Sequence, residues 1–185
     1  FLNQKNTYSL LASYEQLSIE NDRYRKTTAV LGNLTRQLDE LQSVSLGVQL
    51  GEITYEGNNY LRDADLQGLV LGWRGALIHP LQPVLSLQAS WAKELNQARR
   101  PDLGKETLGA RAALAITPAA RWGLSVGVSW NVSEYAADDP ILSTTRKDNF
   151  LAADFTASYR VDRNWSVRGS ALIAKNNSNI ELYDY

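Results

Sequence analysis

Apolar and polar residues alternate along most of the chain. In the segment WGLSVGVSWNVS, every second residue from Trp122 to Val132 is apolar, and the residues between them are Gly, Ser or Asn. Side chains point alternately to the two faces of a β-strand, so this segment predicts a strand with one apolar and one polar face. A soluble sheet would turn the apolar face to a core, whereas an outer-membrane barrel would turn it to lipid and the polar face to the lumen.

The same period of two recurs in eight further segments. They span residues 8–14, 26–38, 44–50, 69–77, 85–91, 108–116, 151–161 and 165–173. The pattern therefore predicts about nine strands of roughly 9–12 residues, the length that a tilted strand needs to cross a bilayer. Apolar residues do not recur at helical spacing, and the charged segment ENDRYRK, residues 20–26, is expected to be a loop.

The expected connections alternate in length. The short ones are DELQ (39–42), HPLQ (79–82), TPAAR (117–121) and VDRN (161–164), and the long ones are residues 16–26, 52–65, 93–106 and 134–149. Short periplasmic turns on one side and long extracellular loops on the other are typical of outer-membrane barrels. A β-sandwich gives no reason for this alternation.

The two expected faces carry different side chains. The apolar face holds the five tryptophans, placed mostly toward strand ends as in an aromatic girdle: Trp73, Trp91, Trp122, Trp130 and Trp165. The polar face holds side chains that are costly to bury without partners, so we assign them to the lumen: Arg74, Arg111, Asp154, Arg160 and Arg168. We expect these arginines to be chiefly structural, with Arg168 within reach of Asp154, and anion selectivity is the alternative.

Composition narrows the function classes. The 185-residue chain has 19 Lys and Arg against 20 Asp and Glu, so charge gives no signal for nucleic acid. It has no cysteine and one histidine, which excludes disulfides and thiolate sites and makes catalytic zinc a poor expectation. Mean hydropathy is −0.32, and no apolar run is long enough for a transmembrane helix.

Few residues suggest bond chemistry. His79 lies beside Pro80 in a short turn, an ordinary place for a polar residue. Asp138 and Asp139 lack the ligand spacing of a calcium loop. We therefore expect no enzyme activity, no catalytic residue, no metal and no cofactor. The basic segment ARRP, with Arg99 and Arg100, either contacts lipopolysaccharide phosphates or is a solvated loop.

The C-terminal part of the chain carries a recognisable pattern. Its elements are Arg-Lys-Asp before a strand, WS after a short turn, and the final NNSNIELYDY, all within residues 144–185. This pattern resembles the barrel domain of the surface lipoprotein assembly modifier family, Gram-negative outer-membrane proteins in which a periplasmic tetratricopeptide-repeat region precedes the barrel. We interpret the matching motif as structural, so that it indicates a family better than an activity.

These observations predict an all-β fold, an antiparallel up-and-down transmembrane β-barrel with about nine to ten strands. The resemblance implies a larger barrel, and Tyr185 falls where a tenth strand would begin. We therefore expect residues 1–185 to be one barrel domain and a fragment, lacking upstream strands and most of the last strand. A complete ten-stranded barrel is the alternative.

The resemblance implies a protein of the bacterial outer membrane that assists export or surface display of a protein substrate such as a lipoprotein. Passage or handover, rather than bond chemistry, would be its mechanism. The alternatives are an outer-membrane porin or polysaccharide-export channel, and a soluble all-β binding domain. Expected partners are outer-membrane lipid, lipopolysaccharide and an exported lipoprotein or polysaccharide, and no nucleic acid.

Overall fold

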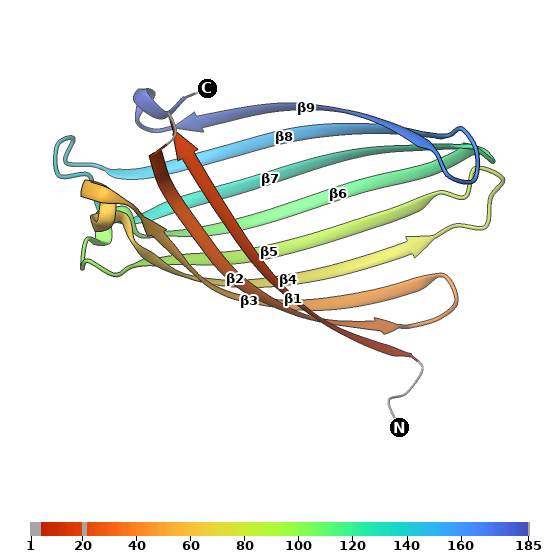
Figure 1. Cartoon of the computed structure of the whole chain (residues 1–185), viewed down its shortest axis with the longest axis horizontal. Helices are drawn as coiled ribbons and strands as arrows, with labels where there is room; N and C mark the ends of the chain where they lie inside the picture. Colours follow the sequence, from red (N-terminus) through yellow and green to blue (C-terminus); the bar gives the residue numbers. More distant parts are fainter. Residues whose placement is uncertain (1–4, 20–21, 185) are drawn as a thin grey trace.

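The computed structural model describes residues 5–19 and 22–184, apart from the side chain of Asn58. These residues form one antiparallel sheet of nine strands in sequential order (Figure 1). The strands are β1 (Asn6–Ile19), β2 (Asp22–Gln37), β3 (Gln42–Tyr55), β4 (Ala64–Ala76), β5 (Val84–Asn96), β6 (Lys105–Ala119), β7 (Trp122–Asp138), β8 (Thr145–Arg160) and β9 (Ser166–Ser178). The all-β, up-and-down antiparallel prediction is confirmed.

The strands are longer than the sequence pattern predicts. Strand β7 has 17 residues and β2 has 16. Residues 22–26, expected to be a loop, begin β2 instead, and residues 20–21 lie outside the described part. Strand pairing needs only backbone N–H and C=O groups, so the hydrogen-bonded ladder continues into the charged segments beyond the apolar stretch.

The strict alternation of connection lengths is therefore wrong. Only residues 20–21 separate β1 from β2, whereas the connection between β4 and β5 spans residues 77–83. Two other connections, between β3 and β4 and between β5 and β6, each contain a short 3₁₀ turn, and a third 3₁₀ turn follows β9. The 3₁₀ turns are η1 (Gly57–Arg62), η2 (Pro101–Leu103) and η3 (Glu181–Tyr183).

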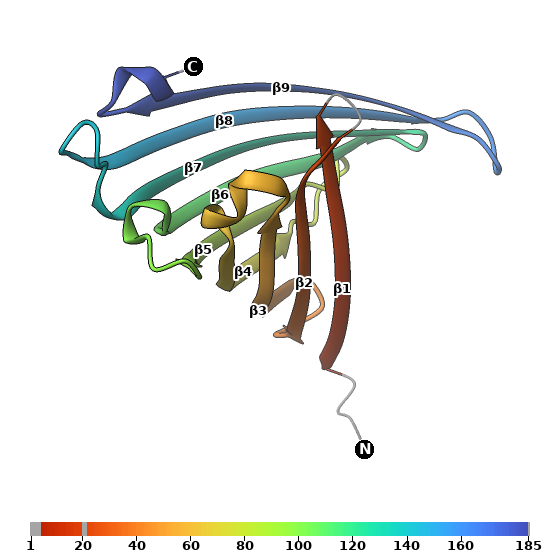
Figure 2. The ribbon, with the colours of Figure 1, turned by 60° about the vertical axis from the view of Figure 1, so that its left-hand side comes forward.

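The sheet has two distinct ends. We call the end with η1, η2, η3 and residues 139–144 the loop end, and the end with residues 38–41, 77–83, 120–121 and 161–165 the turn end (Figures 1 and 2). Strands β1 and β9 both run from the turn end to the loop end. In the described part of the chain they are not paired with each other.

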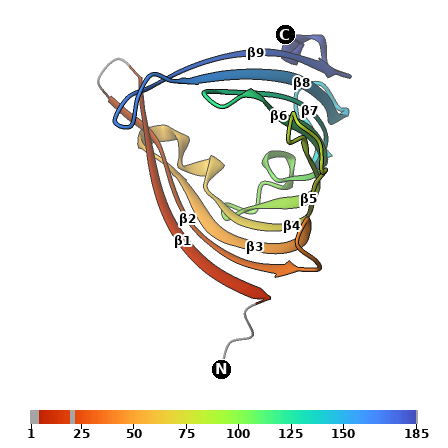
Figure 3. The same cartoon turned by 90° about the vertical axis from the view of Figure 1, so that its right-hand side faces the viewer.

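The sheet is curved into a trough, and η1 and η2 lie inside its curve (Figure 3). Tyr55, Glu94, Lys105, Tyr135 and Arg146, which belong to the polar parity of five strands, line one hollow at the loop end together with residues of η1, η2 and η3. This convergence identifies the polar face as the concave face. The apolar face is convex.

The strand register keeps the two kinds of side chain apart. On the convex face Leu69 lies opposite Trp91, and Val126 lies opposite Phe155. On the concave face Gly127 lies opposite Asp154. The predicted separation of apolar and polar residues is thus found across neighbouring strands, as the side-chain period of two requires.

The sheet encloses no apolar core. Among the described residues the buried hydrophobic ones are Ala29, Ala64, Ala152 and Ile180, and no large side chain is fully buried. The accessible surface is 13322 Å², against about 8900 Å² for a soluble monomer of this mass. No helix in residues 5–19 and 22–184 is long and apolar enough to cross a membrane.

Candidate functional site

The concave face collects the polar side chains that the sequence assigns to a lumen. Arg74 lies opposite Ser43 and Ser86, and Arg111 lies opposite Gln88 and Ser129. Arg160 and Arg168, on β8 and β9, lie opposite Ser166 and Ser158. The register therefore places all four arginines and Asp154 on the concave side of the sheet.

Asp154 forms an ion pair with Arg111, not with Arg168. The Arg111 Nη2 to Asp154 Oδ1 distance is 2.5 Å, and the pair reaches from β6 to β8 across β7. Arg168 lies opposite Ser158, and Leu172 is the residue opposite Asp154 on β9. The predicted contact between Arg168 and Asp154 is wrong, because Ser158 is four residues along β8 from Asp154, beyond the reach of a diagonal neighbour.

Gly127 makes room for this ion pair. A Cβ added at Gly127 would contact Arg111 Nη2 and lie 2.7 Å from Asp154 Oδ1. Both contacting atoms are the ends of flexible side chains, so a larger residue would separate the ion pair rather than move the sheet. The absence of a side chain on β7 thus lets charges from β6 and β8 meet.

We expect Gly127→Ala to lower the free energy of unfolding by about 1–2 kcal/mol, through loss of the ion pair and local overpacking. Equilibrium urea unfolding in detergent micelles measures this. Gly169→Ala is the control, because no atom lies within 4 Å of its added Cβ and its φ is not in the left-handed region. Equal stability of the two variants would contradict this role of Gly127.

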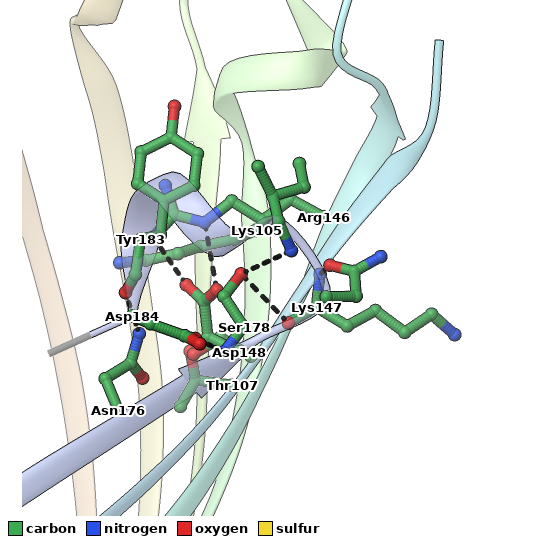
Figure 4. Close-up of polar contacts among 12 residues, drawn as sticks. Lys105, Thr107, Arg146, Lys147, Asp148, Asn176, Ser178, Tyr183 and Asp184 are labelled. Carbon is green, nitrogen blue, oxygen red and sulfur yellow. Dashed lines mark hydrogen bonds and ion pairs between the residues drawn. The ribbon is translucent and has the colours of Figure 1, made fainter. Parts of the chain in front are cut away.

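A second cluster lies on the concave face at the loop end (Figure 4). Arg146 donates to both carboxylate oxygens of Asp148, with distances of 3.0 Å from Nε and 2.7 Å from Nη2. Its guanidinium also lies over the ring of Tyr183 at 3.4 Å and faces the ring of Tyr135 at 4.8 Å. Arg146 therefore fastens η3 to strands β7 and β8 by an ion pair and cation–π contacts.

Hydrogen bonds hold the C-terminal segment against the same strands. Buried Asn176 donates from Nδ2 to the Tyr183 carbonyl at 2.8 Å, and the Ser178 amide donates to Asp184 Oδ1 at 2.5 Å (Figure 4). Asn179 accepts from the Lys147 amide at 2.7 Å and donates to the Thr145 carbonyl at 2.8 Å. The RKD and NNSNIELYDY motifs thus contact each other, which supports interpreting them as structural.

Four of the five tryptophans lie on the convex face of their strands, and the fifth, Trp165, lies in the turn before β9. Trp73 and Trp122 lie near the turn end of their strands, and Trp165 directly precedes β9 there. Trp91 and Trp130 lie deeper in β5 and β7, and each indole donates to a polar side chain. Trp91 donates to Glu106 Oε1 at 2.6 Å, and Trp130 to Asn149 Oδ1 at 2.7 Å.

A row of charges follows the apolar residues on the convex face toward the loop end. Lys93, Glu106, Glu134 and Lys147 lie opposite one another on β5, β6, β7 and β8. Lys147 Nζ is 2.6 Å from Glu134 Oε1, with both side chains more than half exposed. This row forms one border of the apolar band.

The remaining polar candidates have local partners. His79 Nδ1 accepts from the Leu81 amide at 3.2 Å within its turn. Asp139 Oδ1 accepts from the amides of Ile141 and Leu142 at 2.8 and 3.0 Å, and Asp138 accepts from the Thr145 hydroxyl. No group of three or more His, Cys, Asp or Glu residues is placed to hold a metal within residues 5–19 and 22–184.

Of the two arginines considered for contact with lipopolysaccharide phosphates, Arg100 is engaged within the protein. It makes two hydrogen bonds with Asp102, at 2.8 and 2.5 Å. The Arg100 guanidinium thereby lowers the pKa of the Asp102 carboxyl below its usual value. Arg99 is exposed in the same loop.

The comparisons with known proteins concern the part of the chain that holds these clusters. Residues 106–185 match a family described as a protein of unknown function (DUF2860). The matched part is less than half of the chain and extends from β6 to the C-terminus. No curated protein and no solved structure matches the chain. The resemblance to the surface lipoprotein assembly modifier family stays a prediction.

The DUF2860 match contains Arg111, Gly127 and Asp154 as well as the Arg146 cluster. Sequence reasoning missed the contacts of Arg111 with Asp154 and of Arg146 with Tyr183. The sequence did hold a signal for the contact of Arg146 with Tyr183, because these residues belong to the RKD and NNSNIELYDY motifs. For the contact of Arg111 with Asp154, the signal was Gly127, a glycine that lies between two polar positions on neighbouring strands.

Proposed function

We propose that this chain forms the wall of an outer-membrane β-barrel, with its convex face in lipid and its concave face lining a water-filled lumen. The observation that carries the proposal is the broad apolar convex face on a sheet with no apolar core. Val126, Val128 and Phe155 are 47%, 47% and 48% exposed in the middle of their strands. An apolar surface of this extent requires a partner, and lipid covers such a face in membrane barrels.

The height of the apolar band supports lipid as the partner of the convex face. On β7 every convex residue from Trp122 to Val132 is apolar, and Glu134 follows. These residues span about 34 Å along a strand at about 3.4 Å per residue, which is about 24 Å in height for a tilt of about 45°. Barrels of the outer membrane have an apolar band about 25 Å tall.

The borders of the band also fit a bilayer. Trp73, Trp122 and Trp165 lie at its turn-end border, and Trp91 and Trp130 lie close to its charged loop-end border. Indole rings favour the membrane interface, where an apolar ring and a polar N–H are both accommodated. We place the loop end outside the cell, because barrels carry their larger connections there.

Closure of the barrel requires more strands than the nine described. Strands β1 and β9 run in the same direction, so pairing them directly would give a parallel contact. Single-chain bacterial barrels are antiparallel and have an even number of strands. An odd number of additional strands between β9 and β1 satisfies both conditions.

The proposed activity is passage of a substrate along the concave face. Small and polar residues such as Ser45, Gly72, Ser86 and Gln88 line this face between β3 and β5, and they leave it wettable. The sequence resemblance favours a protein substrate such as a surface lipoprotein. The wettable face suits a second candidate function equally well, that of a porin or a polysaccharide channel.

Tryptophan fluorescence in liposomes tests the proposal, because four of the five tryptophans lie on the convex face and Trp165 lies at its turn-end border. We expect lipids brominated on their acyl chains to quench most of the emission and aqueous iodide to quench little. The matched control is the same protein unfolded in urea beside the liposomes. Strong iodide quenching without quenching by brominated lipid would contradict the membrane proposal.

A further inference from the structure

Charges on the concave face do not balance. Within the regular register of the strands, four carboxylates lie on this face, and each forms an ion pair with a cation of the same face. The pairs are Glu15 with Arg25 at 2.8 Å, Glu94 with Lys105 at 3.2 Å, Asp148 with Arg146 at 2.7 Å, and Asp154 with Arg111 at 2.5 Å. Three further cations of this face, Arg74, Arg160 and Arg168, have no ion pair among the described residues and are exposed.

Two of these three arginines are neighbours at the turn end. Arg160 lies opposite Ser166, and Arg168 is two residues farther along β9. Such diagonal positions have Cβ atoms about 7 Å apart or less. Two like charges carried on neighbouring positions repel each other, so the site favours a bound or passing anion that relieves the repulsion.

The neighbouring turns add to the positive charge. A hollow of about 670 Å³ is lined by Ala120, Arg121, Arg160, Asp162 and Arg163. Asp162 is the one carboxylate in this lining, and its Oδ1 already accepts from the amides of Asn164 and Trp165 at 2.7 and 2.9 Å. Three guanidinium groups and one carboxylate border the hollow, which leaves its lining positive, and Arg168 lies on the adjacent strand in a position diagonal to Arg160.

We propose that the concave face at the turn end attracts anions in preference to cations, and that Arg160 and Arg168 supply most of this preference. The inference rests on the proposed function, because a charged face selects among solutes when it lines their path. Guanidinium groups bind carboxylate and phosphate oxygens with paired hydrogen bonds, so these are the anionic groups expected here.

Single cysteines measure the local potential directly, since the chain has no native cysteine. Ser166→Cys places a thiol opposite Arg160, and Ser129→Cys places one opposite Arg111, whose charge Asp154 neutralises. Each thiol is modified with an anionic sulfonatoethyl and a cationic trimethylammonioethyl methanethiosulfonate. The ratio of the anionic to the cationic rate, relative to a free thiol, reports the potential at each position.

We expect this ratio to be about threefold to tenfold higher for Ser166→Cys than for Ser129→Cys, from two screened charges near the first thiol. Arg160→Gln with Arg168→Gln should remove the difference, and each single substitution should remove part of it. The control is Arg36→Gln with Arg99→Gln, one on the convex face and one in a loop. It changes the net charge by the same amount and should leave the difference between the two thiols unchanged. The difference should also vanish in about 1 M salt, where the Debye length is about 3 Å.

Equal ratios at the two thiols, or a ratio unchanged by Arg160→Gln with Arg168→Gln, would overturn the inference. The rates can be measured in detergent as well as in liposomes and do not depend on conductance. A high ratio in detergent combined with absent bromolipid quenching would retain the anion-attracting site and reject the membrane proposal. Quenching with equal ratios would reject the anion inference alone.

Discussion

Lysine in place of Val128 is expected to destabilise the protein in a bilayer by about 2–4 kcal/mol, the cost of a cation near the midplane on the lipid side of a barrel. Val128 is 47% exposed on the convex face and lies near the middle of the band from Trp122 to Val132. Urea unfolding from liposomes measures the difference in free energy.

The control is Ser125→Lys, on the concave face of the same strand, opposite Ala115 and Thr156. A lysine there meets water in the proposed barrel, so the free energy of unfolding should change by about 0.5 kcal/mol or less. Equal destabilisation by the two lysines would show that the two faces meet the same environment, contrary to the proposal.

Arg146→Ala is expected to lower the free energy of unfolding by about 2–3 kcal/mol, because it leaves the Asp148 carboxylate without its cation in a mostly buried setting. The Arg146 and Asp148 side chains are 21% and 12% exposed. The substitution also removes the cation over the Tyr183 ring. We therefore expect η3 to detach from the sheet before the strands separate.

Urea unfolding together with hydrogen exchange of the Tyr183 amide, which donates to the Ile180 carbonyl, checks both parts of this prediction. Lys147→Ala, on the next residue, removes an exposed ion pair with Glu134 and should cost about 1 kcal/mol or less. Destabilisation by Arg146→Ala with unchanged exchange at Tyr183 would contradict the role of Arg146 in fastening η3.

The number of strands and the faces of their side chains could be predicted because the period of two is a local property. Leu69, Trp91, Val126 and Phe155 occupy the convex face whatever the exact pairing of their strands. The alternating pattern predicts strands that are too short, because pairing at the strand ends does not depend on local side-chain alternation. Backbone pairing continues through charged residues such as Arg25 and Lys26, which the apolar pattern does not mark.

Side-chain pairing could not be predicted from hairpins alone. Arg111 meets Asp154 across an intervening strand, and the contact depends on the missing side chain of Gly127. The expected partner, Arg168, lies opposite Ser158, four residues along β8 from Asp154. In a sheet, an error of one residue moves every diagonal neighbour, so such contacts require the three-dimensional structure.

The most direct test of the account places nitroxide spin labels, one at a time, on cysteines at Leu124, Ser125, Val126, Val128 and Ser129 in liposomes. The account predicts that accessibility to oxygen, which concentrates in lipid, is high at Leu124, Val126 and Val128. Accessibility to an aqueous nickel chelate should instead be high at Ser125 and Ser129. Uniform accessibility along these positions, or the inverse alternation, would contradict a lipid-facing convex side and a water-facing concave side.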